Sequence, residues 1–329
     1  MTEFQYTDPP RSPIPSQYGV VPDPKLILLI LIVLILVGMV VGALVTLGIG
    51  HFSWITINEA LAELSPQSAP AIRNYVRSIN LASHVFGFVL PVLGLAFWFY
   101  RRQMWRWLQL HRLPNWTLFI QGVLFVLVSL PLVQFLFYIN KNIPLPDWMV
   151  LTETDTNDMI VGLLTMPSFM EFAFTLLVVA IVPALGEELV FRGVAQPALR
   201  RWTGSAHAAV WITAVIFSAI HFQFQGFLPR MFLGALLGYL LVWTQNLWVP
   251  ILAHFFNNAL QVALGYFSPD LIQVAASGTA AKAWSPAVGG FVAIMSLLFT
   301  VWIGQRIRRY NGRIAFHASA VVDDVKQQT

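Results

Sequence analysis

An uninterrupted apolar run over residues 26–37 is the feature that most constrains how this chain can fold. The run belongs to a longer apolar stretch, 26–48, which is too long for the core of a signal peptide and has no small-residue cleavage site after a short apolar core. A helix needs about 20 apolar residues to cross a hydrocarbon core of about 30 Å. The stretch therefore predicts a retained transmembrane helix.

Seven further apolar stretches predict eight spans in total. They cover residues 79–100, 116–138, 172–202, 208–222, 231–243, 247–267 and 287–303. Only 10% of the residues are charged, whereas a soluble domain carries about 25%. We therefore predict an all-α fold, a polytopic membrane helical bundle of about eight transmembrane helices. The fifth and sixth spans are short and are expected to lie buried within the bundle.

The same patterning divides the chain into five parts. Six prolines and no apolar periodicity in residues 1–25 predict a disordered cytoplasmic tail. The other parts are the N-terminal transmembrane helices with an extracytoplasmic loop at 139–170 (26–170), a core that carries intramembrane polar residues (171–268), a loop with the last transmembrane helix (269–310) and a cytoplasmic tail (311–329). Two short helices, 57–64 and 71–78, are expected between the first two spans.

The basic residues predict the orientation. With a cytoplasmic N-terminus, 13 of the 19 Lys and Arg residues face the cytoplasm and Arg192 lies inside the membrane, as the positive-inside rule requires. The five outward residues are Arg73, Arg77, Lys141, Arg230 and Lys282. We expect an integral protein of the plasma membrane with both termini in the cytoplasm. A net charge of +4 is too small for nucleic-acid binding, and the absence of cysteine excludes disulfides and thiolate sites.

Charged residues interrupt the fourth predicted span at Glu187, Glu188 and Arg192. A charge at the bilayer centre costs about 2.5–3.5 kcal/mol on insertion scales, so such residues are functional candidates. Glu188 and Arg192 share one helix face and can form an ion pair, whereas Glu187 points about 100° away. Glu187, without that partner, is the candidate general base. The alternative is an amphipathic helix at the cytoplasmic surface, with all three groups in water.

Two more polar pairs lie on neighbouring predicted spans. His221 follows Phe217 by four residues, and His254 and Asn258 have the same spacing. Each pair alone is also typical of interfacial groups or interhelical hydrogen bonds. Together with Glu187 they supply a carboxylate base, imidazoles and an amide donor for an oxyanion, which is a set suited to hydrolysis. His221 ends an outward-running span and reaches Glu187 only if that span is short, tilted or re-entrant.

These motifs, EExxxR, FxxxH and HxxxN in that order on successive membrane helices, resemble those of the CAAX protease and bacteriocin-processing family. The resemblance covers about residues 172–267, which makes 171–268 the predicted catalytic core. It implies an intramembrane endopeptidase, a hydrolase in which Glu187 activates the attacking water. Glu188 and Arg192 would hold the geometry of the site. The remaining catalytic residues would be His221 and His254, which line the water, and Asn258, which completes the site.

The resemblance leaves the need for a metal open. Members of the family are often called metalloproteases, and Glu187, His221 and His254 resemble a zinc-binding set of one Glu and two His. Asparagine is not a usual zinc ligand, and a Glu-activated water with His and Asn donors needs no metal, so the sequence slightly favours metal-free chemistry. Zinc is the alternative, and no other cofactor motif is present.

The implied partners are the lipid bilayer and a membrane-associated protein or peptide substrate. In the prenyl endopeptidase branch of the family, the reaction is CAAX processing, the removal of a C-terminal tripeptide after a prenylated cysteine. Two other functions stay open: a proton- or ion-coupled transporter that uses the same ionisable residues, and a non-catalytic immunity or scaffold member of the family. His84 and Tyr239 have no partner at helical spacing and are expected to be packing or interfacial groups.

Overall fold

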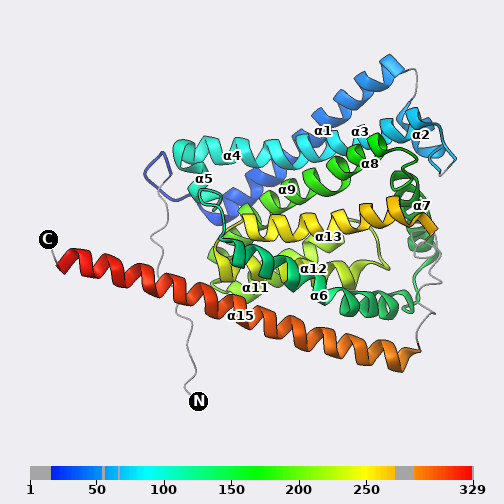
Figure 1. The fold of residues 1–329 in the computed structure, drawn as a ribbon. Helices are drawn as coiled ribbons and strands as arrows, with labels where there is room; N and C mark the ends of the chain where they lie inside the picture. The colour runs from blue at the N-terminus through cyan, green and yellow to red at the C-terminus, as the bar shows by residue number, and fades with distance from the viewer. Residues whose placement is uncertain (1–15, 54–55, 66, 271–284, 328–329) are drawn as a thin grey trace.

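Helices make up all the regular secondary structure in the part of the chain that the computed structural model describes, residues 16–53, 56–65, 67–270 and 285–327. The prediction of an all-α membrane bundle is therefore confirmed (Figure 1). The first half comprises α1 (Pro24–Ser53), α2 (Ile57–Ala62), α3 (Pro70–His84), η1 (Val85–Val89), α4 (Leu90–Tyr100), η2 (Arg101–Gln103), α5 (Met104–Trp107), α6 (Trp116–Lys141) and α7 (Asp147–Leu163). The second half comprises α8 (Phe169–Thr175), η3 (Leu176–Ile181), α9 (Val182–Glu188), η4 (Leu189–Ala195), α10 (Gln196–Thr203), α11 (Ala206–Ala219), α12 (Phe227–Thr244), α13 (Trp248–Phe267) and α15 (Pro286–Gln327).

Six of the eight predicted spans are long and apolar enough to cross a membrane. The helix α11 has only 14 residues, and α13 has 20 residues but is too polar to meet the same criterion. The sixth predicted span is longer than expected, because α12 begins at Phe227. These two exceptions, α11 and α13, are among the helices that bring polar groups to the candidate site.

Two long spans contain π-helical turns. One runs over Pro70–Trp107 and contains η1, and the other runs over Phe169–Thr203 and contains η3 and η4. Each π turn is followed by an α-helix with proline at its second residue: Pro91, Pro183 and Pro197. Proline cannot donate a backbone hydrogen bond and its ring clashes with the carbonyl of residue i−4. The wider π turn accommodates this missing bond without breaking the span.

The segment 139–170 was expected to be a loop, and this was wrong because it contains α7. Pro146 precedes α7 and Asp147 occupies its first turn, an arrangement that favours helix initiation. Figure 1 shows α7 beside α2 at one end of the bundle, whereas α5 lies at the opposite end. Of the residues predicted as a tail, 1–25, residues 1–15 lie outside the described part of the chain. The segment 311–327 continues α15 as a helix.

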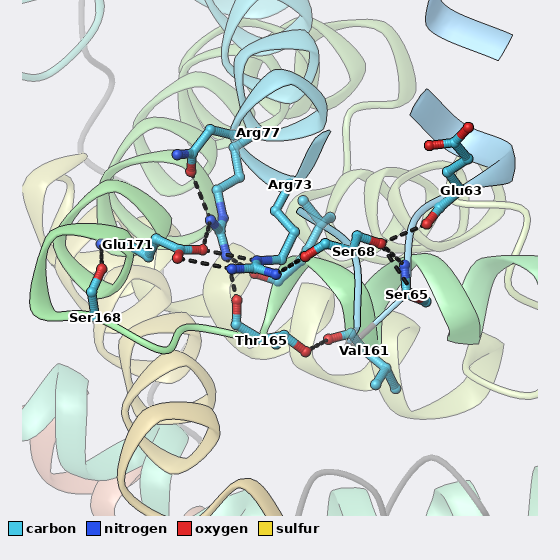
Figure 2. Close-up of polar contacts among 11 residues, drawn as sticks. Glu63, Ser65, Ser68, Arg73, Arg77, Val161, Thr165, Ser168 and Glu171 are labelled. Atoms are coloured by element: carbon cyan, nitrogen blue, oxygen red, sulfur yellow. Dashed lines mark hydrogen bonds and ion pairs between the residues drawn. The ribbon is translucent and has the colours of Figure 1, made fainter. Parts of the chain in front are cut away.

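A buried ion cluster joins three segments at the α7 end of the bundle (Figure 2). Arg73 and Arg77 of α3 contact Glu171 of α8, with distances of 2.9 Å from Arg73 Nε and 2.8 Å from Arg77 Nη1 to the same carboxylate oxygen. Arg77 Nη2 also donates to the carbonyls of Leu163 and Thr165. All three charged side chains are buried. The cluster ties α3 to the α7–α8 connection and fixes the start of the span that carries Glu187.

Candidate functional site

Glu188 and Arg192 form the ion pair that their spacing predicts. Glu188 ends α9 and Arg192 lies in η4, and both side chains are fully buried. Arg192 Nη1 donates to Glu188 Oε1 at 2.8 Å, and Nη2 donates to the carbonyl of Gly234 in α12 at 2.7 Å. The pair therefore links the Glu-bearing span to α12. Its burial excludes the alternative in which these groups lie in water at the cytoplasmic surface.

Glu188 also orients His254 on α13. The Nδ1 atom of His254 lies 2.8 Å from Glu188 Oε1, the same oxygen that accepts from Arg192. A carboxylate can only accept, so Nδ1 carries the proton and donates it. In the neutral ring, Nε2 is then unprotonated, and it lies 3.9 Å from Glu187 Oε2. This separation is too long for a direct hydrogen bond and is compatible with a bridging water.

Glu187 has a second histidine neighbour that the sequence did not indicate. His84 Nε2 lies 3.2 Å from Glu187 Oε1, and His84 Nδ1 lies 3.0 Å from the carbonyl oxygen of Asn80. The interpretation of His84 as a packing group was therefore wrong, as was the expectation that Glu187 lacks a partner. The two residues are separated by 103 positions in the chain, so no helical spacing relates them. Tyr239, the other residue predicted to be a packing or interfacial group, stacks on the ring of Trp243, with ring centroids 5.4 Å apart.

His221 lies two residues beyond the end of α11 and lines the same cavity as Glu187. The condition that the fifth span be short is met, because α11 ends at Ala219. His221 Nδ1 lies 2.7 Å from the carbonyl oxygen of Phe217, which makes Nδ1 the donor and turns Nε2 away from this backbone contact.

The FxxxH motif has a structural explanation in the ring of Phe217. This ring packs edge-on against His221 and His254, with centroid distances of 5.0 Å and 6.2 Å. The Arg192 guanidinium carbon lies 4.9 Å from the centre of the same ring, within the range of a cation–π contact. Phe217 therefore packs against both imidazoles and against the cation that holds Glu188.

Asn258 is anchored one turn beyond His254 on α13. Its Nδ2 donates to the carbonyl of Val179 in η3 at 3.1 Å, and its Oδ1 accepts from Asn257 at 3.1 Å. An amide nitrogen has two hydrogens, so one N–H of Asn258 remains available for another acceptor. The structure thus brings together all six predicted site residues: Glu187, Glu188, Arg192, His221, His254 and Asn258.

These groups border a cavity of about 750 Å³ that extends toward α7. Glu187, His84, His221, His254 and Asn258 line it. Further polar lining comes from residues that the sequence analysis did not single out for the site: Asn80, Glu153, Thr156, Asn157, Gln223, Arg230, Asn257 and Gln261. A cavity of this size is typical of a small-molecule or peptide site. Its α7 wall could not be predicted while 139–170 was interpreted as a loop.

A bound metal has no evident ligand set here. Within residues 16–53, 56–65, 67–270 and 285–327, no three His, Asp or Glu side chains are grouped so that they could hold a metal ion. Glu187 and His254, two of the three predicted zinc ligands, are instead in contact with His84 and Glu188. We therefore derive no chemical step through a metal.

Comparison with known proteins supports the family resemblance. Residues 169–260 match the family described as type II CAAX prenyl endopeptidase Rce1-like. The matched segment runs from the start of α8 into α13 and contains all six predicted site residues, but not His84. The segment that carries these residues is therefore similar to the core of the CAAX protease and bacteriocin-processing family.

One curated relative is similar to a shorter part of the chain. The uncharacterized protein YpbD of Bacillus subtilis (strain 168) is 36% identical over 81 residues, which make up 23% of this chain and 38% of that protein. The match thus spans less than half of the relative. No solved structure matches this chain.

Proposed function

We propose that this protein is an intramembrane endopeptidase in which Glu187 activates a water molecule for the hydrolysis of a peptide bond. The observation that carries the proposal is the position of Glu187: its carboxylate borders a polar cavity of about 750 Å³ together with three histidines, within the Rce1-like segment. A buried carboxylate beside imidazoles in a cavity is a recognised arrangement for general acid–base catalysis.

The proposed reaction begins with a water between Glu187 Oε2 and His254 Nε2, which lie 3.9 Å apart. Glu187 removes a proton from this water while the water oxygen forms a bond to the scissile carbonyl carbon. The carbonyl oxygen becomes an oxyanion, and the free N–H of Asn258 is the proposed donor to it. Glu187 then returns the proton to the leaving nitrogen as the carbon–nitrogen bond breaks.

The other residues have positioning roles in this proposal. Glu188 accepts a hydrogen bond from Nδ1 of His254, so the unprotonated Nε2 is the ring nitrogen that contacts the water. Arg192 neutralises Glu188 and so prevents two adjacent uncompensated carboxylates in a buried site. His84 holds Glu187 Oε1, which keeps Oε2 directed at His254. His221 lines the same cavity as these groups.

We further propose that the substrate is a membrane-associated protein processed near its C-terminus, with prenylated CAAX-type proteins as the class to test first. The family description supports this class. The apolar side chains Phe137, Ile160 and Leu233 line the cavity beside its polar groups, so a substrate with an apolar anchor is compatible with it.

The proposed orientation has both termini in the cytoplasm, in the plasma membrane. The basic residues Arg101 and Arg102 lie in η2, and Arg106 lies in α5, at the end of the bundle opposite α7. The positive-inside rule supports a cytoplasmic position for that end. In this orientation α7 lies on the outer side, and the cavity extends from Glu187 toward it.

The test is cleavage of a prenylated CAAX peptide by the full-length protein in detergent, followed by mass spectrometry. We expect the wild type to release the C-terminal fragment and Glu187→Gln to release none, with activity retained after chelation. Activity that disappears with chelator and returns with zinc would contradict the metal-free mechanism. Equal cleavage by Glu187→Gln would contradict the role of Glu187.

A further inference from the structure

Arg230 differs from the buried arginines that the structure describes. Arg73, Arg77 and Arg192 each contact a carboxylate within 4.0 Å. Arg230 lies in the first turn of α12 and lines the same cavity as Glu187, and among the side chains that the structure describes no carboxylate forms an ion pair with it at that distance. Within the described part of the chain, its guanidinium is therefore a positive charge at the cavity wall without an ionic partner.

The hydrogen bonds of Arg230 are also incomplete. Nη2 donates to the side chain of Gln223, whereas Nη1 is buried and has no hydrogen-bond partner. A buried donor that is left unpaired is costly, more so when it is charged. The guanidinium is thus expected to receive an acceptor from a molecule that enters the cavity.

The two nearby carboxylates, Glu153 and Glu187, do not contact Nη1 of Arg230. Glu153 and Glu187 line the same cavity as Arg230, but neither forms an ion pair with it within 4.0 Å. Glu153 Oε2 accepts from the backbone N–H groups of Phe224 and Gln225, at 2.8 Å and 3.3 Å. Glu187 Oε1 contacts His84. Neither carboxylate therefore occupies the Nη1 side of the guanidinium.

We propose that Arg230 binds a carboxylate of the peptide substrate, and that this carboxylate is the free C-terminus. This inference rests on the proposed endopeptidase function. Arginine presents a planar fork of N–H donors that matches a carboxylate, and the bond is strong in a site from which water is excluded. Arg230 and Glu187 border one cavity, so a substrate bound at its chain end by Arg230 is directed toward Glu187.

This arrangement makes Arg230 a specificity-determining residue. An extended chain spans about 3.3–3.6 Å per residue, so an anchored C-terminus fixes how many residues separate it from the cleaved bond. Peptides that differ only in their number of C-terminal residues should then be cleaved at a constant distance from the chain end. Without such an anchor, the cleavage position would follow the local sequence or the apolar group instead.

The same carboxylate chemistry could come from an acidic side chain of the substrate. Three peptides separate these sources: one with a free C-terminus, one with a C-terminal amide, and one with a C-terminal amide and a glutamate as its last residue. The free acid should react about 10- to 100-fold faster in kcat/KM than the plain amide, the factor expected for a lost hydrogen bond between charged groups. Rescue of the amide by the added glutamate would assign the site to acidic side chains.

The variants are Arg230→Gln, Arg230→Lys and the matched control Arg306→Gln, which removes one positive charge from an exposed position on α15. We expect Arg230→Gln to abolish the preference for the free acid over the amide, and Arg230→Lys to retain part of it. Arg306→Gln should keep the full preference. A structural role of Arg230 would slow both peptides equally, so an unchanged ratio in Arg230→Gln would overturn the proposal.

Failure of the endopeptidase function would give a different result. Binding of the acid and amide peptides to Glu187→Gln, measured by fluorescence anisotropy, does not depend on turnover. The carboxylate site would be supported, even if no peptide is cleaved, by two results together: Glu187→Gln binds the acid more tightly than the amide, and the double variant Glu187→Gln/Arg230→Gln binds both equally. Cleavage that depends on Glu187 but is equal for acid and amide would refute the carboxylate site and leave the endopeptidase function standing.

Discussion

The adjacent residues Glu187 and Glu188 are proposed to have different roles, and substitution of each should affect stability differently. We expect Glu188→Gln to destabilise the protein strongly, whereas Glu187→Gln should leave its stability nearly unchanged. Glu188 is fully buried, and its Oε1 accepts from Arg192 and from His254, each at 2.8 Å. Among the described side chains, the ion-pair contacts of Glu187 are to histidines, at 3.2 Å and 3.9 Å. Both substitutions should abolish activity, so stability distinguishes the two roles.

The magnitude follows from the burial of the ion pair. Removal of one partner of a buried pair leaves the other charge uncompensated and costs about 3–5 kcal/mol. At roughly 2–4 °C per kcal/mol for domains of a few hundred residues, Glu188→Gln should lower the thermal midpoint by about 10 °C. Glu187→Gln should shift the midpoint by no more than about 2 °C, since it leaves no unpaired arginine.

The assay is thermal unfolding in detergent, followed by intrinsic tryptophan fluorescence of the purified full-length variants. Replacement of both Glu188 and Arg192 by methionine should recover most of the lost stability without recovering activity, because apolar side chains of similar volume can replace a buried pair. An unchanged midpoint in Glu188→Gln would refute the structural role of the pair. A larger loss in Glu187→Gln than in Glu188→Gln would reverse the assignment.

Three further predictions concern other parts of the molecule. His84→Gln should lower kcat at least about tenfold with little change in KM or in the thermal midpoint, because glutamine can donate to the catalytic carboxylate but cannot take up and release a proton as an imidazole can; an equal change in KM would indicate substrate binding instead. Gly38→Ala should destabilise α1 packing, since a Cβ there would lie 1.9 Å from the carbonyl oxygen of the facing η1 residue, whereas Gly48→Ala in the same helix meets nothing within 4 Å and should be neutral or stabilising by thermal unfolding. The chain has no cysteine, so in intact cells a membrane-impermeant maleimide should label Asn142→Cys but not Gln103→Cys; the reverse pattern would invert the proposed orientation.

Local spacing in the sequence predicted the contacts that depend on one helix. Glu188 and Arg192 are a single turn apart, and their ion pair forms as expected. Such contacts follow from helical geometry alone, because residues four apart share a face.

Contacts between distant segments could not be found in the same way. His84 reaches Glu187 from a helix 103 residues earlier, and Arg230 was counted only as an outward-facing charge. The α7 wall was missed because its sequence mixes acidic and apolar residues without a clear period, and its helix forms at the end of the bundle. In each case the tertiary packing, rather than the local pattern, decides the role of the residue.

The most direct test of Glu187 as a general base is a single turnover in water enriched in oxygen-18, with the full-length protein in excess over a prenylated CAAX peptide. We predict one labelled oxygen in the new carboxyl group of the amino-terminal product and no label in the peptide that contains Glu187. Label in Glu187 would show that this residue attacks the substrate directly, and the absence of any cleaved product would show that the cavity does not hydrolyse this class of peptide. The first result would contradict the proposed mechanism, and the second would contradict the proposed substrate class.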